Sequence, residues 1–382
     1  MFSLSDLPIR DNLRGLVPYG APQEDVGIRL NVNENTHAIP ENVATDIVTA
    51  LAKAVLGANR YPDREFTELR MSLAKYLNGT LATDPNAGSR FGHSGATLLG
   101  PENIWAANGS NEVLQQIMQA FGGPGRSLLG FPPTYSMHSI IASATDTRWI
   151  AGERDEDYEI SPQTAVRWIR QSNPDIVFFC SPNNPTGTPL SLETIVAAYD
   201  ATDGILVVDE AYAEFGPSQL PTALSLLDGR ERLVVSRTMS KAFAFAGARL
   251  GYLAAHPAIA DALRLVRLPY HLSALTQAAA IAALAHSEEM LAMVDDIKTQ
   301  RNRLLEELPK LGFPVRPSWS NFVLFGGVRS PRELFEHLLE KDIIIRDVGI
   351  ANHLRVTAGT AAETTAFLEA MASLSALDRI GA

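Results

Sequence analysis

The chain has 382 residues and a formal net charge of −11 at pH 7, with 46% hydrophobic and 20% charged residues. This composition is typical of a globular protein and excludes disordered and fibrous architectures. At about 150 residues per domain, the length predicts two domains with a large buried core. The acidic balance argues against a general binder of nucleic acid or of anionic membranes, because both need a cationic surface on the protein.

Cysteine usage and the distribution of apolar residues indicate the compartment. Cys180 is the single cysteine, so an internal disulfide is impossible and a reducing compartment is expected. Residues 1–14 have no continuous apolar stretch, so we expect no secretory signal. The apolar segment 272–285 is interrupted by polar residues and is too short to span a bilayer. The sequence therefore predicts a soluble, cytoplasmic protein.

The first hundred residues are expected to contain an arm, two helices and a loop. Residues 1–44 are rich in Asn, Pro and Gly, which favours an arm over a domain. In the second of the two helices that follow, apolar side chains recur at helical spacing from Phe66 to Leu77. Residues 79–101 collect Gly, Ser, Thr and Pro and are expected to form an exposed loop.

Short apolar runs alternate with amphipathic helical segments from Asn103 onward. Runs that are this short and this continuously apolar suit strands buried on both faces of a parallel sheet. Their alternation with helices predicts an α/β fold with a large doubly wound, mainly parallel sheet. The runs are 104–107, 127–130, 176–180, 205–208 and 233–235.

The C-terminal third of the chain has a different pattern. An alanine-rich helical region is expected at 272–308, and short strands and helices follow it. This α+β pattern indicates a second, smaller domain. We therefore predict a large domain at 45–270 and a smaller one at 271–382, with the arm at 1–44 contributing to the smaller domain and to the substrate site.

Polar residues follow four of the predicted strands. Because ligands of open α/β sheets bind beyond the carboxyl ends of the strands, these residues are expected to meet at one site. Their side chains suit one charged, planar, phosphorylated ligand. The four segments are 108–112, 181–187, 209–212 and 236–241.

The segment Gly109-Ser110-Asn111 is predicted to open a helix directly after a strand. The free N–H groups and the positive dipole at such a helix end bind phosphate groups. Alternatively, Ser110 or Asn111 serves only as the N-terminal cap of the helix.

Asp209 ends a strongly apolar strand and is expected to be buried, so its carboxylate needs a partner. A protonated ring nitrogen of a ligand is one candidate partner, and an arginine or a backbone cap is the alternative. Tyr212, three residues later, either reaches a neighbouring oxygen of that ring with its hydroxyl or only packs.

Lys241 follows the next strand, beside hydroxyl side chains and an apolar segment at 242–245, with Arg249 eight residues later. Desolvation in such a setting lowers the pKa of an amine and makes the amine competent to form an imine. Arg249 is a candidate for bidentate phosphate binding. The alternative is that Lys241 is an ordinary surface lysine.

Several common site patterns are absent from the sequence. It contains no Gly-x-Gly-x-x-Gly after a predicted strand, no Walker-type glycine loop and no Gly-x-Ser-x-Gly elbow. The eight histidines show no metal-ligand spacing, so we expect no metal site. These observations disfavour nicotinamide, P-loop and metallohydrolase chemistry.

The polar segments resemble, in order and spacing, the fold-type-I pyridoxal-phosphate-dependent aminotransferases. The resemblance lies in Asn-Pro-Thr-Gly at 184–187, Asp-Glu-Ala-Tyr at 209–212, and Ser-Lys at 240–241 with Arg249 downstream. Within that family the chain is most similar to the histidinol-phosphate aminotransferases, particularly the actinobacterial ones. The segments that carry this closer resemblance are 17–20, 60–63, 131–135, 208–215, 237–243 and 345–347.

The resemblance implies a fold-type-I architecture and pyridoxal 5'-phosphate as the cofactor. Lys241 would carry the cofactor as an imine and would move a proton between substrate and cofactor. Asp209 would pair with the pyridinium nitrogen and keep the ring an electron sink. Asn184 and Tyr212 would hydrogen-bond the phenolic oxygen of the ring, and Tyr135 would stack on the ring.

The resemblance also implies a phosphate site and a subunit interface. Tyr61 of the partner subunit would reach the cofactor phosphate, so the site would be shared and the protein would be a homodimer. The residues of the same subunit that would hold this phosphate are Ser110, Asn111, Thr238, Ser240 and Arg249.

For the substrate, the resemblance implies that Arg346 and Arg355 bind the anion and that Tyr19 closes over it. A guanidinium can clamp a carboxylate or a phosphate ester, which suits amino transfer between L-histidinol phosphate and 2-oxoglutarate in L-histidine biosynthesis. From the sequence alone, both arginines are equally well explained as surface ion-pair residues. Thr36 stands where family members usually carry proline, which loosens a segment expected to border the substrate.

Other proteins share most of these motifs. An aromatic-amino-acid aminotransferase and a threonine-phosphate decarboxylase are alternatives within the enzyme class. A pyridoxal-phosphate-binding regulator without turnover is an alternative from another class, but such regulators carry a DNA-binding module, and the arm has neither the length nor the basic patch for one. Small molecules, rather than nucleic acid or membrane, are the expected binding partners.

Overall fold

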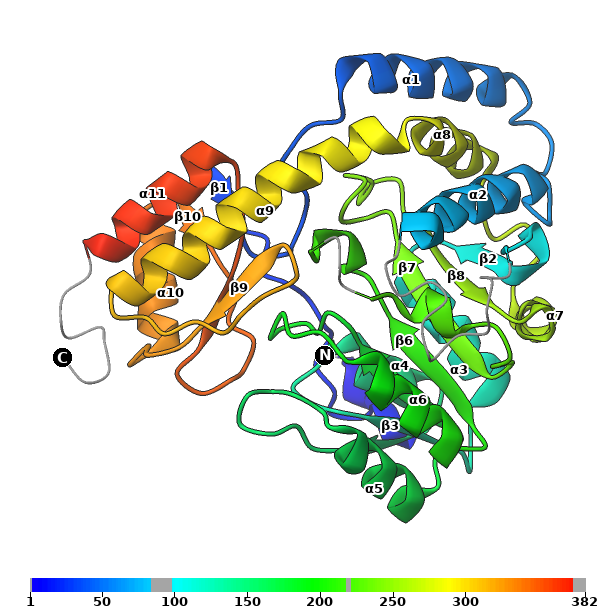
Figure 1. Cartoon of the computed structure of the whole chain (residues 1–382), viewed down its shortest axis with the longest axis horizontal. Helices are drawn as coiled ribbons and strands as arrows, with labels where there is room; N and C mark the ends of the chain where they lie inside the picture. Colours follow the sequence, from blue (N-terminus) through cyan, green and yellow to red (C-terminus); the bar gives the residue numbers. More distant parts are fainter. Residues whose placement is uncertain (1, 84–97, 218–220, 374–382) are drawn as a thin grey trace.

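The computed structural model describes residues 2–83, 98–217 and 221–373. Figure 1 shows two groups of elements, which are bridged by the long helix α9 (Ser287–Lys310). One group is a large sheet with its helices, and the other consists of C-terminal strands and helices. Most of the loop predicted at 79–101 lies outside the described residues.

The described part of the large sheet has seven strands. They are β2 (Ile104–Ala107), β3 (Ser127–Gly130), β4 (Arg148–Ala151), β5 (Ile176–Cys180), β6 (Ile205–Asp209), β7 (Leu233–Thr238) and β8 (Gly251–Ala255). Their order is β2-β8-β7-β6-β5-β3-β4. Strands β3 to β7 pair in parallel, whereas β8 is antiparallel to both of its neighbours. This confirms the predicted mainly parallel sheet.

Helices connect the strands of the large sheet. They are α3 (Ser110–Phe121), α4 (Met137–Ala144), α5 (Pro162–Ser172), α6 (Leu192–Ala201) and α7 (Pro257–Val266). Helix α3 packs against α4 and α7, and α5 packs against α6. The alternation of buried strands with helices confirms the predicted α/β fold class. None of the helices formed by the described residues is long and apolar enough to cross a membrane.

The N-terminal segment contains two short 3-10 turns, a short strand and two helices. These are η1 (Leu4–Asp6), η2 (Asp11–Leu13), β1 (Ile28–Arg29), α1 (Glu41–Leu56) and α2 (Thr67–Thr83). The side chain of Arg10, next to η2, connects the arm to the end of α4, because its Nη2 donates a hydrogen bond to Ala144 O at 2.7 Å. Three further 3-10 turns are η3 (Pro101–Asn103), η4 (Ala213–Phe215) and η5 (Ala223–Leu226).

The C-terminal group also includes the N-terminal strand β1. Its elements after α8 (Ala274–Ala285) and α9 are β9 (Phe322–Phe325), α10 (Pro331–Glu340), β10 (Ile343–Ile344), β11 (Leu354–Thr357) and α11 (Ala361–Ala372). Strand β1 pairs in parallel with β10, and β9 pairs antiparallel with β11. The domain boundaries at 1–44, 45–270 and 271–382 stay a prediction.

The strands predicted from apolar runs are all present, and β6 and β7 extend beyond the predicted ends. Strands β4 and β8 were not predicted. Strand β4 lies at the sheet edge and is only half-buried, and β8 is rich in Gly and Ala, which have low strand propensity. The helical region expected at 272–308 is confirmed, and it consists of two helices, α8 and α9, which meet at His286.

Candidate active site

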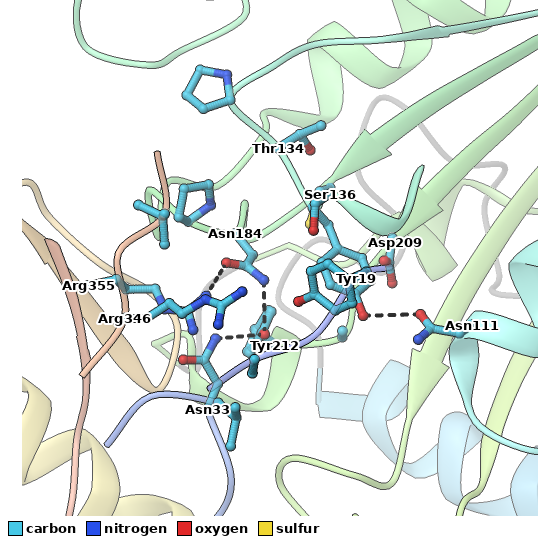
Figure 2. A pocket seen from close by; sticks show the side chains of 18 of the residues that line it. Tyr19, Asn33, Asn111, Thr134, Ser136, Asn184, Asp209, Tyr212, Arg346 and Arg355 are labelled. Atoms are coloured by element: carbon cyan, nitrogen blue, oxygen red, sulfur yellow. Dashed lines mark hydrogen bonds between the residues drawn. The ribbon is translucent and has the colours of Figure 1, made fainter. Parts of the chain in front are cut away.

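A cavity of about 620 Å³ lies at the carboxyl ends of the parallel strands. Its walls come from the large sheet, from the N-terminal segment and from the strands of the C-terminal group, as Figure 2 shows. The structure brings most of the predicted site residues together in this cavity. These are Tyr19, Ser110, Asn111, Tyr135, Asn184, Asp209, Tyr212, Thr238, Ser240, Lys241, Arg249, Arg346 and Arg355.

Tyr61 is the predicted site residue that does not line this cavity. Its side chain is exposed, and its ring stacks on Tyr270 with the ring centroids 4.4 Å apart. The family resemblance implies that this tyrosine belongs to the site of a partner subunit, so its role stays a prediction.

Asp209 lies at the end of β6 with its side chain buried. Ser236 Oγ donates to Oδ1 at 3.0 Å, and His138 Nε2 lies 3.5 Å from Oδ2. Among the described residues, no arginine and no backbone N–H group bonds the carboxylate of Asp209. The alternative partners considered for this carboxylate, an arginine or a backbone cap, are therefore wrong. A carboxylate accepts about four hydrogen bonds, so Asp209 can still receive a donor from a ligand in the cavity.

Lys241 lies three residues after the end of β7 and is half-buried, so the interpretation as an ordinary surface lysine is wrong. Its Nζ donates to the backbone oxygen of Val32 at 3.0 Å. Burial, followed by the positive charge of Arg355, lowers the pKa of this amine to about 8. The neutral amine, which is the nucleophile, is therefore far more abundant at neutral pH than for an ordinary lysine.

Tyr212 is buried and receives two hydrogen bonds at its hydroxyl (Figure 2). Asn33 Nδ2 lies 3.0 Å and Asn184 Nδ2 lies 3.5 Å from the hydroxyl oxygen. Burial raises the pKa of Tyr212, although the charge of Arg355 and the hydrogen bond from Asn33 oppose the rise. The hydroxyl therefore keeps its proton at physiological pH.

Arg355 is buried on β11, so its interpretation as a surface ion-pair residue is wrong. It donates to Asn184 Oδ1 and to the backbone oxygen of Asn31, both at 2.7 Å. Its Nε has no hydrogen-bond partner, and no carboxylate of the described residues pairs with its guanidinium. Burial lowers the pKa of Arg355 to about 10. A buried cation of this kind fits an anionic ligand.

Arg346 lies beside Arg355 and contacts the ring of Tyr19. The Arg346 guanidinium carbon is 5.9 Å from the centroid of the Tyr19 ring. Within the described part of the chain it also forms no ion pair. The side chain of Tyr19 lines the cavity and is half-exposed.

The part of the cavity at the start of helix α3 suits a phosphate. Helix α3 begins at Ser110 after Gly109, which has φ of 86°, and no side chain caps the helix. The interpretation of Ser110 or Asn111 as a cap is therefore wrong, and the first N–H groups of α3 are open to an anion. A side chain at position 109 would collide with the guanidinium of Arg249. No cluster of metal-binding side chains occurs in the described ranges.

Comparison with known proteins identifies the family. A family model described as aminotransferase class I and II matches residues 25–371. The chain belongs to this family. Histidinol-phosphate aminotransferases of Paenarthrobacter aurescens and Frankia casuarinae are 59% and 53% identical to this aminotransferase, over 97% and 96% of its length and 96% and 89% of theirs.

A solved structure confirms the fold of this aminotransferase. The structure of histidinol-phosphate aminotransferase from Sinorhizobium meliloti, in complex with pyridoxal-5'-phosphate, superimposes with a TM-score of 0.82. The match covers 96% of this chain and 98% of that chain, at 24% sequence identity. The fold-type-I architecture expected from the sequence is therefore correct.

Pyridoxal phosphate is the cofactor of this aminotransferase family, and the cavity fits it in three respects. Asp209 is a buried carboxylate with two uncharged or titratable partners and room for a further donor. Lys241 supplies an amine of lowered pKa. The first turn of α3 and Arg249 supply an anion site that a side chain at Gly109 would fill.

Four residues that take part in this geometry were not predicted from the sequence as site residues. Asn31, Asn33 and Trp149 line the cavity, and His138 contacts Asp209 from α4. Asn33 belongs to the segment 33–36, which is expected to border the substrate. This expectation is the one feature of the sequence that could have indicated Asn33. His138 is a single histidine on an apolar helix, and a pattern of this kind gives no indication of function.

Proposed function

We propose that this aminotransferase interconverts L-histidinol phosphate and 2-oxoglutarate with imidazole-acetol phosphate and L-glutamate, in L-histidine biosynthesis. The proposal is supported by the names of the relatives that are 59% and 53% identical over nearly the whole chain. The observation that carries it is the buried Arg355, a cation without a counter-ion in the same cavity as Lys241.

Each half-reaction brings an anion to Arg355. Glutamate carries a carboxylate beside its reacting amine, and histidinol phosphate carries a phosphate ester instead. Since a guanidinium presents a fork of donors to either group, one arginine can orient both substrates. Arg346 adds a second positive charge, and Tyr19, whose ring lies beside the Arg346 guanidinium, is proposed to close over the substrate.

The residues around the cofactor site take the following proposed roles. When bound, pyridoxal phosphate supplies an electron sink that permits loss of the proton from the substrate carbon. Lys241 accepts and returns that proton, for which a pKa near 8 is well suited. Asp209 holds the ring nitrogen protonated, while Asn184 and Tyr212 bind the phenolic oxygen. Tyr135 packs against the ring.

The phosphate group of the cofactor is proposed to bind at the start of α3. The backbone N–H groups of Ser110 and Asn111 face this end, and the amide of Asn111 accepts a hydrogen bond from the Tyr135 hydroxyl at 3.1 Å through its oxygen, which leaves its nitrogen as a donor. The hydroxyls of Thr238 and Ser240 and the guanidinium of Arg249 line the same cavity.

We further propose a cytoplasmic homodimer in which Tyr61 of the partner subunit contacts this phosphate. The exposed, stacked pair of Tyr61 and Tyr270 supports the proposal, because an aromatic pair of this size on the surface is typical of a protein–protein interface.

The test is a substrate panel with the purified holoenzyme. Histidinol phosphate, tyrosine and phosphothreonine are each offered with 2-oxoglutarate, while glutamate formation and carbon dioxide release are followed. We expect glutamate formation to be fastest with histidinol phosphate, with parallel double-reciprocal lines as in a ping-pong reaction. Preference for tyrosine would identify an aromatic-amino-acid aminotransferase, and carbon dioxide release from phosphothreonine would identify a decarboxylase.

A further inference from the structure

Asn33 is a buried residue of the cavity that has no role in the proposed function. It contacts three parts of the molecule. Its Nδ2 lies 3.0 Å from the Tyr212 hydroxyl, its backbone N–H donates to Thr357 Oγ1 at 3.1 Å, and its backbone oxygen accepts from Asn321 Nδ2 at 3.0 Å. Figure 2 shows its side chain directed at Tyr212.

The hydrogen bonds of Arg355 fix the orientation of the Asn184 amide. A guanidinium only donates hydrogen bonds, so the atom of Asn184 that lies 2.7 Å from Arg355 Nη1 must be the oxygen. The amide nitrogen of Asn184 then faces Tyr212 and donates to its hydroxyl.

Thr357 contacts the amide of Asn33. Its Oγ1 accepts the backbone N–H of Asn33 and donates its own proton to Asn33 Oδ1, each at 3.1 Å. The oxygen of the Asn33 amide therefore faces Thr357. Its nitrogen faces Tyr212 and can only donate to the hydroxyl.

Two donors thus point at one hydroxyl. Among the described residues, no third group bonds the Tyr212 hydroxyl. A phenolic hydroxyl has one proton, and here the lone pairs of its oxygen are engaged by two amides. Its own proton is left for an acceptor inside the cavity that Tyr212 lines.

We propose that Asn33 is a positioning residue, which acts with Asn184 to hold the Tyr212 hydroxyl as a hydrogen-bond donor into the cavity. The inference rests on the proposed function, in which the acceptor is the phenolic oxygen of the cofactor. Asn33 itself is held by Thr357, which lies two residues after Arg355 on β11. The strand that binds the substrate anion therefore also orients the donor to the cofactor.

The proposal has a spectroscopic consequence that does not depend on substrate. The negative phenolic oxygen of the cofactor favours a proton on the neighbouring nitrogen that joins the cofactor to Lys241. A donor directed at that oxygen weakens this attraction. Loss of the directed donor therefore raises the pH at which the visible absorbance of the lysine-bound cofactor titrates.

The backbone at Asn33 suggests a suitable variant. Asn33 has φ of 56°, a left-handed conformation that glycine adopts without strain. Asn33→Gly therefore removes the amide while the backbone conformation remains accessible. Asn352→Gly is the matched control, because Asn352 has φ of 60° and a hydrogen bond from its Nδ2 to Val328 O at 2.9 Å, but does not line the cavity.

The experiment is a pH titration of the visible absorbance of the holoenzymes. We expect Asn33→Gly to raise the titration midpoint by about one pH unit and to lower kcat about five- to tenfold, with KM changed less than twofold. Asn352→Gly is expected to titrate like the unmodified enzyme. An unchanged midpoint in Asn33→Gly overturns the proposal.

A double-mutant cycle with Tyr212→Phe separates positioning from a general structural effect. If Asn33 acts through the Tyr212 hydroxyl, Asn33→Gly produces no further shift when the hydroxyl is absent. A full additional shift in the Tyr212→Phe background overturns the proposal. Should Asn33→Gly not fold, Asn33→Asp replaces the donor by a carboxylate that accepts the Tyr212 proton and turns it away from the cavity, so the midpoint is again expected to rise, and an unchanged midpoint overturns the proposal.

Failure of the proposed function is detected separately. It is measured on the unmodified protein, as absence of a visible band after incubation with pyridoxal phosphate or absence of turnover with histidinol phosphate. If the unmodified protein has the band and turns over tyrosine instead, the Asn33 titration still decides the inference, because it uses no substrate.

Discussion

Arg346 and Arg355 face each other across an antiparallel backbone bridge, with Arg346 N 3.0 Å from Arg355 O and Arg355 N 2.9 Å from Arg346 O. This pairing holds two guanidinium groups at one side of the cavity, and Figure 2 shows both of them near Asn184. The charge of Arg346 contributes to lowering the pKa of Arg355, after the larger effect of burial. Two like charges held together by the backbone are unfavourable until an anion lies between them, so the arrangement favours anionic substrates.

Arg355→Ala is expected to weaken the binding of both anionic substrates. A hydrogen bond between charged groups contributes about 1.5–3 kcal/mol, so KM for glutamate and for histidinol phosphate should each rise about 10- to 100-fold. Steady-state kinetics measure this, and the visible absorbance of the cofactor should stay near that of the unmodified enzyme.

Arg332→Ala is the control for Arg355→Ala. Arg332 is exposed and pairs with Glu336 on α10, outside the cavity, so its loss should leave both KM values unchanged. Loss of the cofactor from Arg355→Ala with unchanged substrate affinity would show that Arg355 serves the cofactor instead.

Lys241→Ala is expected to abolish the visible absorbance of lysine-bound pyridoxal phosphate and all transamination, while the fold is kept. The reason is that no other amine of the described residues lines the cavity. Absorbance spectra, circular dichroism and borohydride reduction followed by peptide mapping measure the three effects. Lys310→Ala, which removes an exposed lysine on α9, should behave like the unmodified enzyme. Normal activity in Lys241→Ala would refute the assignment.

Lys241 is also expected to make the stability of the cofactor-free enzyme depend on pH. Its pKa is about 8 in the folded protein and 10.5 ordinarily, so between these values the unfolded chain binds more protons than the folded one. Stability therefore rises with pH through this window, and the cost of burying the charged amine is present in full below about pH 8.

Lys241→Met removes this cost. At pH 7 the cofactor-free variant is expected to be more stable than the unmodified protein by about 2 kcal/mol, and the difference should shrink as the pH rises toward 10.5. Denaturant unfolding at pH 7, 8.5 and 10 measures the difference. A difference that is constant with pH would mean that packing, rather than ionisation of Lys241, causes it.

The sequence was sufficient to predict the part of the fold that builds the cofactor end of the cavity. Strands such as β5 and β6 are continuous apolar runs because both faces of the sheet are covered, and the polar residues that follow them mark the carboxyl edge. Strand β4 escaped prediction because an edge strand is solvated on one side, and its Arg148 is exposed.

The substrate end of the cavity was not predictable from local patterns. Arg355 and Asn33 are more than three hundred residues apart in the sequence and become neighbours through Thr357. His138 acquires its contact with Asp209 from the packing of α4, and nothing in the sequence around it indicates that contact. Such contacts between distant segments depend on tertiary packing, whereas propensity and periodicity describe neighbours along the chain.

Gly109→Ala is expected to weaken the phosphate end of the cavity. Position 109 has φ of 86°, where an alanine is strained by about 1–2 kcal/mol, and its methyl group would collide with the Arg249 guanidinium. Gly123→Ala is the matched control, since position 123 has φ of 106° but no atom within 4 Å of an added Cβ. Both variants should lose similar stability in thermal unfolding, whereas Gly109→Ala alone should bind pyridoxal phosphate about tenfold more weakly in an absorbance titration. Equal cofactor affinity in the two variants would mean that the helix start and Arg249 do not hold the phosphate.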